Sequence, residues 1–307
     1  MATATTTTQT QTFHPIAAAM REARKFTGDP LTWTANDGND LQKTWLQSLP
    51  QFTADLANVP EMKQIANTDV RKINKFLKDE GFQIQLKPFT PGGFGMASVM
   101  KIAMEWLSAG RKVTIRPAGL AYPPSAVYRG AALTEGVTVF ADINPATGIR
   151  REPIVQVHTK TGDMVYLQAC DVAALANDDL NEIHDAMQSA VARQVRDTNF
   201  KGVHFPVIHL DDSPDISWLL GMTCSGPKMQ DGAFISQALQ QTKFTMDESG
   251  AKVESAVAIA MTRNCLASSR PSPPPVIINK TFVVTIVRPG VHWPIFIGKL
   301  GPDVWVQ

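Results

Sequence analysis

Residues 244–264 constrain the fold most, because they keep the pattern of a β-strand beyond the point where a strand should end. Residues 240–246 are β-branched, aromatic and alternating, and the turn-forming residues 247–250 follow them. After Gly250 the odd positions stay small or apolar, while the even positions begin with a lysine and a glutamate and continue as alanines. This period of two indicates that the segment continues in a sheet with one face buried.

Residues 262–275 limit how far this segment extends. They are polar and then proline-rich, and proline lacks the N–H group that a central strand needs. The strand-like segment is therefore joined to an exposed loop. The alternation alone is also compatible with a linker between a helix and a strand.

Residues 244–256 (FTMDESGAKVESA) resemble the hinge of the serpin family. In that family a strand of the large sheet runs through an acidic pair and a glycine into the small residues that open the reactive-centre loop. Residues 203–222 are similar to the family's strand leading to a helix end, and residues 232–241 to its short helix and strand entry. Residues 275–287 and 293–300 resemble its two closing hydrophobic strands.

The resemblance spans residues 202–302 and implies an α+β, serpin-like fold. Large mixed or antiparallel sheets would be covered by helices, with an exposed reactive-centre loop. We expect residues 13–307 to form a single serpin-like domain, divergent and shortened in its N-terminal part. Residues 1–12 are rich in Thr and Gln and are predicted to be a disordered tail.

The resemblance implies a protease inhibitor that acts as a suicide substrate. The target protease, of the serine or cysteine class, would attack the loop and be trapped when the cleaved loop inserts into the large sheet as a new strand. The resemblance places the reactive bond within Arg263, Asn264 and Cys265.

The hinge and insertion face are expected along the strand-like segment. Their residues are Glu248, Gly250, Ala251, Val253, Ser255 and Val257. Val253 and Val257 are bulkier than the residues that inhibitors of the family favour there, so we expect slower insertion. The alternative is a non-inhibitory serpin-fold protein with a binding, storage, chaperone or structural role.

Apolar spacing and alternation predict the elements of the N-terminal part. Helices are predicted at residues 13–26, 40–56, 68–81, 97–108 and 180–195, and strands at residues 82–89, 112–116, 136–142, 153–159 and 163–169. Thr68 and Gly81 are the predicted caps of the third helix.

A second alternative is a nucleotide-binding enzyme that uses the loop from Gly93 to Ser98. This loop follows a predicted strand and opens a predicted helix, which is the setting of a dinucleotide-binding glycine loop. The match is incomplete, because Ser98 replaces the third glycine and no acidic residue ends a second strand at the expected distance. Apart from this alternative, the chain is not expected to be an enzyme.

Composition limits the partners. Of the 307 residues 44% are hydrophobic, and the net charge of +1 provides no field for nucleic acid. No apolar run is long enough to cross a bilayer. The three cysteines lack metal-site spacing, so no metal or cofactor is expected. The N-terminal residues do not resemble a signal peptide, which predicts an intracellular protein. Self-association by strand addition is a further expectation.

Overall fold

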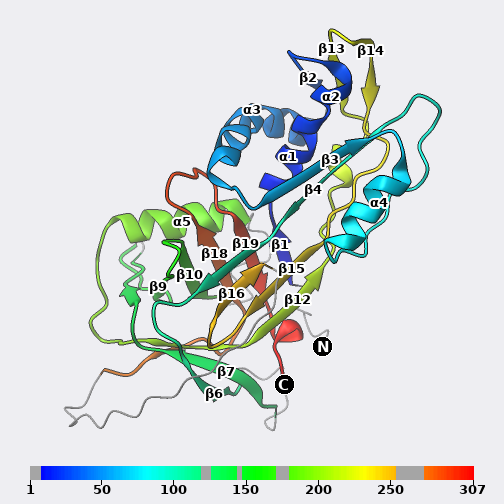
Figure 1. Cartoon of the computed structure of the whole chain (residues 1–307). Coiled ribbons are helices and arrows are strands. Elements are labelled where there is room, and N and C mark those ends of the chain that lie inside the picture. Colours follow the sequence, from blue (N-terminus) through cyan, green and yellow to red (C-terminus); the bar gives the residue numbers. More distant parts are fainter. Residues whose placement is uncertain (1–7, 119–125, 144–146, 171–179, 254–272) are drawn as a thin grey trace, which may run out of the picture.

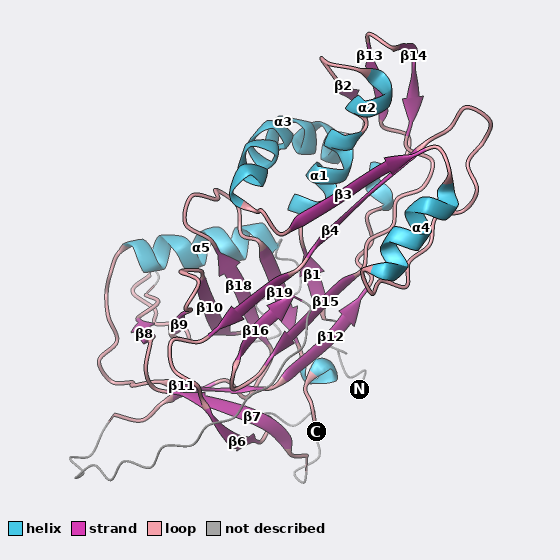
Figure 2. Cartoon of the chain, in the orientation of Figure 1, coloured by secondary structure: helices cyan, strands magenta, loops and turns pink. Residues whose placement is uncertain are grey.

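The computed structural model describes residues 8–118, 126–143, 147–170, 180–253 and 273–307. Strands make up most of the described architecture, and the helices lie on the outside of the sheets (Figure 1, Figure 2). The chain is therefore a mixed α+β protein with several antiparallel sheets, as the sequence predicted.

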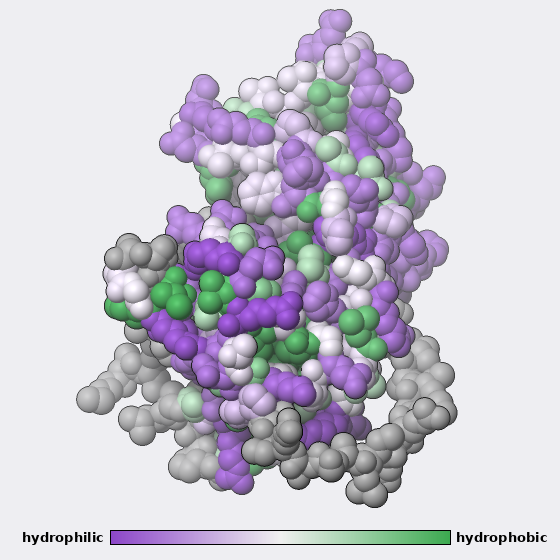
Figure 3. Space-filling view, turned by 90° about the vertical axis from the view of Figure 1, so that its left-hand side faces the viewer, coloured by the Kyte–Doolittle hydropathy of each residue, from purple (hydrophilic) through white to green (hydrophobic). Residues whose placement is uncertain are grey.

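The largest sheet has six strands in the order β1-β19-β18-β10-β9-β8, and each neighbouring pair is antiparallel. Its strands are β1 (Gln9–Gln11), β8 (Val137–Phe140), β9 (Ile154–His158), β10 (Met164–Ala169), β18 (Phe282–Val287) and β19 (Phe296–Leu300). Helix α5 (Leu180–Ala192) packs on one face through Met187 and Ala190. The outer surface on this side is largely hydrophilic, with small hydrophobic groups (Figure 3).

A four-stranded antiparallel sheet, which we call the central sheet, has the order β12-β15-β16-β5. Its strands are β5 (Ile102–Glu105), β12 (Ile208–Asp212), β15 (Thr242–Met246) and β16 (Gly250–Val253). Alternate residues of β15 are buried, because one face of the sheet covers the main hydrophobic core. Phe244 of β15 stacks on Phe296 of β19 with ring centroids 4.5 Å apart, which joins the central sheet to the six-stranded one.

The described residues form three further sheets, of four, three and two strands. The first contains β6 (Arg111–Ile115), β7 (Tyr128–Leu133), β11 (Val203–Pro206) and β17 (Val276–Ile277). The second contains β2 (Thr32–Thr34), β13 (Thr223–Gly226) and β14 (Met229–Phe234), and the third contains β3 (Met62–Asn67) and β4 (Gly95–Met100). β4 comes directly before β5 in the chain, so it continues one side of the central sheet.

Four helices lie in the N-terminal part of the described chain, and the first and last of them pack against β3 and β4. They are α1 (His14–Glu22), α2 (Arg24–Thr27), α3 (Asp40–Asp55) and α4 (Val70–Asp79). α1 contacts both strands and shares a core with α3. α4 packs against the same hairpin through Ile73 and Leu77. Short 3-10 turns lie at Leu56–Asn58, Ser217–Leu219 and Pro302–Val304.

Several sequence predictions are confirmed. The helices predicted at residues 40–56 and 180–195 are α3 and α5, and the closing hydrophobic strands are β18 and β19. The helix predicted at residues 68–81 is α4, but Asp69 caps it instead of Thr68. The Asp69 carboxylate accepts a hydrogen bond from the backbone N–H of Arg71 at 3.0 Å.

The helix predicted at residues 97–108 is wrong, because this segment forms β4 and β5. Ala, Met and Lys favour helices in isolation, but pairing with β3 and β16 outweighs that preference. The loop from Gly93 to Ser98 therefore runs into a strand instead of opening a helix, and the geometry of a dinucleotide-binding loop is not formed.

The strand predicted at residues 82–89 is also wrong, since these residues belong to no helix or strand. Side chains from other segments form hydrogen bonds with some of their backbone N–H and carbonyl groups. Asn74 accepts from the N–H of Leu86 at 2.9 Å and donates to its carbonyl at 2.9 Å. Residues 232–241 do not form the expected short helix: β14 ends at Phe234, and residues 235–241 are irregular.

Candidate functional site

Residues 247–250, which contain the acidic pair, form a turn between β15 and β16. The Asp247 carboxylate accepts hydrogen bonds from the backbone N–H groups of Ser249 at 2.7 Å and Gly250 at 3.2 Å. The Asp247 N–H donates to the Gly250 carbonyl at 2.9 Å, which closes the turn. The prediction that the first strand continues past this turn is wrong. β15 stops at Met246, and the chain reverses into β16.

β16 lies inside the central sheet, between β15 and β5, and is antiparallel to both. Ala251 pairs with Met246 on one side and Met104 on the other, and it is fully buried. Gly250 lies so close to β5 that an added Cβ would overlap the Met104 carbonyl oxygen. Glycine is therefore the residue that permits this approach.

Hydrogen bonds and an ion pair hold this turn against residues 106–112, which follow β5 and lead into β6. The indole N–H of Trp106 donates to the Asp247 carbonyl at 2.9 Å, and the Gly110 N–H donates to the Glu248 carbonyl at 2.7 Å. The Glu248 carboxylate forms an ion pair with Lys112 at 3.4 Å. The start of the predicted hinge is thus anchored by β5, β6 and the loop between them.

The other predicted site residues lie outside the described residues. These are Ser255 and Val257 of the insertion face, and Arg263, Asn264 and Cys265 of the reactive bond. The structure places Glu248, Gly250, Ala251 and Val253 together in the β15–β16 hairpin. The roles of all these residues remain predictions.

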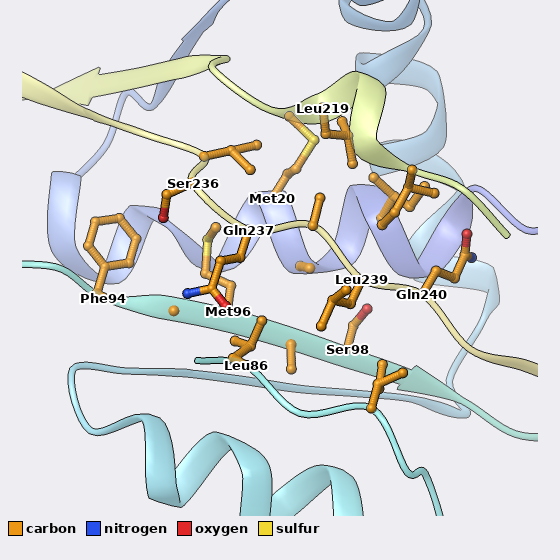
Figure 4. Close-up of a pocket in the computed structure, with 18 of the residues that line it drawn as sticks. Met20, Leu86, Phe94, Met96, Ser98, Leu219, Ser236, Gln237, Leu239 and Gln240 are labelled. Carbon is orange, nitrogen blue, oxygen red and sulfur yellow. The ribbon is translucent and has the colours of Figure 1, made fainter. Parts of the chain in front are cut away.

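A cavity of about 690 Å³ lies beyond β16, in the direction in which that strand runs. β4 lines one side and residues 232–243 line the other; these segments continue β5 and β15 respectively. Met20 of α1 closes the back, and Met96 and Leu239 point into the same space (Figure 4). The cavity therefore occupies the place that an extension of β16 would take between its two neighbours.

Residues 81–87 run along this cavity between α4 and residues 237–241, and we call them the strap. Leu86 of the strap lines the cavity (Figure 4). Gln237 accepts a hydrogen bond from the Lys87 N–H at 2.7 Å and donates to the Lys87 carbonyl at 3.1 Å. Gln241 accepts from the Gln83 N–H at 2.7 Å. The sequence did not predict this arrangement, because segments about 150 residues apart build it.

A buried polar cluster lies on the other side of α1. Asp55, at the end of α3, is 1% exposed, and its carboxylate accepts from the backbone N–H groups of His292 at 3.1 Å and Trp293 at 3.3 Å. His292 Nδ1 and His14 Nε2 lie 2.8 and 3.5 Å from its oxygens. Burial alone would raise the pKa of Asp55, but its hydrogen bonds from His292 and Trp293 hold that pKa below its ordinary value.

His14 is fully buried, and burial lowers its pKa even though the Asp55 carboxylate acts in the opposite direction. Arg288 forms a second buried cluster, with ion pairs at 2.8 Å to both Glu61 and Asp163. These groups join the helices to the six-stranded sheet. These contacts between separate elements give both clusters a structural role.

The described residues show little metal or thiol chemistry. Within them, no three His, Cys, Asp or Glu side chains come together as a metal site. Burial raises the pKa of the Cys224 thiol, which keeps it protonated and unreactive. No helix in the described ranges is both long and apolar enough to span a membrane.

Taken together, these sheets and helices give the chain the serpin fold. It is similar to the serpin thyroxine-binding globulin in complex with thyroxine, with a TM-score of 0.55 and 10% identity over 97% of this chain and 93% of that one. It is also similar to the mouse protein-Z dependent protease inhibitor, with a TM-score of 0.54 and 13% identity over 95% and 90% of the two chains. No family model and no curated protein sequence matches the chain.

Proposed function

We propose that the chain is a protease inhibitor of the serpin type, whose cleaved loop inserts into the central sheet. The observation that carries this proposal is the position of β16, which already lies between β15 and β5 and runs toward the cavity. One of the two similar solved structures is a protease inhibitor by its title, which supports the same assignment. The partner proposed is a serine or cysteine protease that cuts within residues 263–265.

The register of β16 specifies how insertion would proceed. Val253 pairs with Ile102 of β5, and Ala251 pairs with Met246 of β15. Each further step of two residues along the loop would therefore lie opposite residues two positions earlier in β4 on one side, and two positions earlier in β15 or the segment before it on the other. Continued in this register, Ser255 would lie opposite Met100 and Thr242, and Val257 would lie opposite Ser98 and Gln240. All four of these partner residues line the cavity.

Insertion would stabilise the protein for two reasons. The new strand would add ladder hydrogen bonds along β4, which pairs with β3 along its other edge. It would also fill a largely apolar cavity, and apolar burial is favourable by roughly 25 cal/mol per Å². Because Ala251 is buried, the odd-numbered residues after it would face the inner side of the cavity.

The test is the thermal stability of the protein after its loop is cut between residues 262 and 268. We expect the unfolding midpoint to rise strongly after cleavage, and a covalent complex of intact mass to form with the target protease. The variant Val257→Asp, which would bring a charge into the cavity, should abolish the rise. Ser268→Asp adds the same charge beyond the proposed reactive bond and should leave the rise intact.

The second candidate is a non-inhibitory binding protein, and the cavity itself favours it. Its volume of about 690 Å³ lies in the range of small-molecule sites, and the other similar structure is a globulin in complex with thyroxine. Under this reading, cleavage of the loop leaves the unfolding midpoint unchanged. Such a result, without any covalent complex, would replace the inhibitor proposal.

A further inference from the structure

Three exposed aliphatic side chains gather at the edge of the six-stranded sheet where β8 is the last strand. They are Ile143, Ile149 and Val195, with exposed fractions of 39%, 64% and 46%. Ile143 pairs across a bridge with Arg150, the residue after Ile149. The Val195 carbonyl accepts a hydrogen bond from the Ala141 N–H at 2.8 Å, which brings its segment alongside. This side of the molecule faces the viewer in Figure 3, where green hydrophobic groups lie beside deep purple hydrophilic ones.

Four exposed arginines belong to the segments that flank residues 140–143. They are Arg150, Arg151, Arg193 and Arg196. The guanidinium groups of Arg151 and Arg193 lie 3.2 and 3.7 Å from the carboxylate oxygens of Asp142. Arg150 forms an ion pair with Asp197. Arg196 lies opposite Phe140 of β8 across a bridge, so all four arginines lie around the same edge of the sheet.

The two aspartates are buried and hold these guanidinium groups in place. Asp142 also accepts a hydrogen bond from the Gln168 side-chain amide at 2.9 Å. Asp197 also accepts one from the Asn199 N–H at 3.2 Å. The three arginine side chains that pair with them stay 37% to 49% exposed. The guanidinium groups are therefore fixed from the inside of the protein, and their exposed parts can bind a partner.

Positive charge is concentrated on this surface. Four guanidinium groups face two carboxylates, which leaves an excess of two positive charges. Glu152 does not offset this excess, because it forms an ion pair with Lys280 at 2.7 Å. The whole chain carries a net charge of only +1. The excess is thus a local feature and not a consequence of a basic chain, so it favours a negatively charged partner.

We propose that this surface, which we call the β8 surface, binds an acidic segment of a partner protein that also carries aliphatic side chains. Arginine pairs with carboxylates through two parallel hydrogen bonds, and covering the exposed aliphatic groups removes apolar area from water. A sulfated polysaccharide or a nucleic acid would pair with the arginines but leave the three aliphatic side chains exposed, whereas a protein segment can contact both. The proposal does not rest on loop insertion, so it is independent of the proposed inhibitory function.

The experiment measures binding of a fluorescein-labelled peptide to the intact protein by fluorescence anisotropy. The peptide has about twelve residues and repeats the sequence leucine, glutamate, glutamate. Two variants change the β8 surface, Arg196→Glu and Ile149→Ser. Their matched controls make the same changes at exposed positions on other elements, Arg24→Glu on α2 and Leu41→Ser on α3. All four side chains are exposed, so each variant should keep the wild-type unfolding midpoint.

We expect saturable binding to the wild type. Arg196→Glu should weaken it about tenfold, because the reversed charge repels the peptide, and Ile149→Ser about threefold, because an apolar contact is lost. Both controls should stay within about twofold of the wild type. Equal losses in Arg24→Glu and Arg196→Glu would show that the peptide responds only to net charge and would refute the proposal. A wild type that binds a sulfated polysaccharide but not the peptide, or an Ile149→Ser variant with wild-type affinity, would refute a protein partner.

Discussion

Replacing Asp55 with alanine should strongly destabilise the protein. This one buried carboxylate joins the end of α3 to α1 and to the segment between β18 and β19. Its oxygens accept hydrogen bonds from the backbone of His292 and Trp293 and approach the imidazoles of His14 and His292. Asp55→Ala would remove the acceptor for the backbone N–H groups of His292 and Trp293 and the charge beside the buried imidazole of His14, while the exposed side chain of His292 can bind water instead. No buried charge is left behind, because His14 is neutral at the pH of the assay, so the cost is that of unpaired donors, about 1 to 3 kcal/mol for each donor that stays buried.

The assay is urea unfolding of the intact protein at pH 8, where Asp55 is ionised and His14 is neutral. Asp55→Asn keeps one acceptor oxygen and should lose about 1 to 2 kcal/mol of unfolding free energy. The control is Asp79→Ala. Asp79 is 56% exposed and forms an ion pair with Lys75 on the same helix, so its loss should cost less than about 0.5 kcal/mol. A loss below 1 kcal/mol for Asp55→Ala would show that the cluster does not join the helices to the sheet.

The same cluster predicts how stability depends on pH. The folded-state pKa values of His14 and Asp55 both lie below their ordinary values, so the unfolded chain binds more protons as the pH falls. Stability should be complete above about pH 6.5, decline below it as the unfolded histidine takes up a proton, and decline again below about pH 4. His14→Phe should reduce the first decline, and an unchanged decline would assign it to His184 and His204, whose pKa values burial also lowers.

Two further predictions concern the central sheet and the second buried cluster. Gly250→Val should lower the unfolding free energy by about 1 to 3 kcal/mol in thermal unfolding, since the new Cβ would overlap the Met104 carbonyl. The control, Ser249→Ala on the exposed side of the turn, should have little effect in this assay. Arg288→Leu should cost about 3 to 5 kcal/mol by leaving Asp163, 2% exposed, and Glu61 without their cation. Arg288→Lys should recover only part of this in urea unfolding, and full recovery would contradict a need for the guanidinium's several donors.

Part of the fold could be predicted from the sequence, and the reasons are physical. β18 and β19 are long apolar runs, and both are buried on two faces, so composition alone identifies them. β4 and β5 were assigned to a helix because their alanines and methionines favour helices. Only the pairing of β5 with β16, which lies about 150 residues later in the chain, reveals the strand.

The candidate site was less predictable than the fold. The hinge residues from Glu248 to Val253 follow from local alternation and from the resemblance, since they are consecutive in the chain. The cavity and the strap depend on contacts such as Gln237 to Lys87, between residues whose local sequences carry no shared signal. The several glutamines in residues 237–241 are the one available hint, because amide side chains can bind backbone groups in both directions.

The position of Gly250 in the sheet also determines which of the residues after it face the core. Ala251 faces the core, and successive residues of a strand face opposite sides of the sheet, so insertion of the loop as proposed would place its odd-numbered residues on the inner face. Deleting one residue directly after Val253 would exchange the two faces of the inserted strand, so that Ser255 would move from the inner face to the outer one. Deleting two residues would preserve the faces and only shorten the strand. If the loop inserts as proposed, it should therefore tolerate deletions of two residues better than deletions of one.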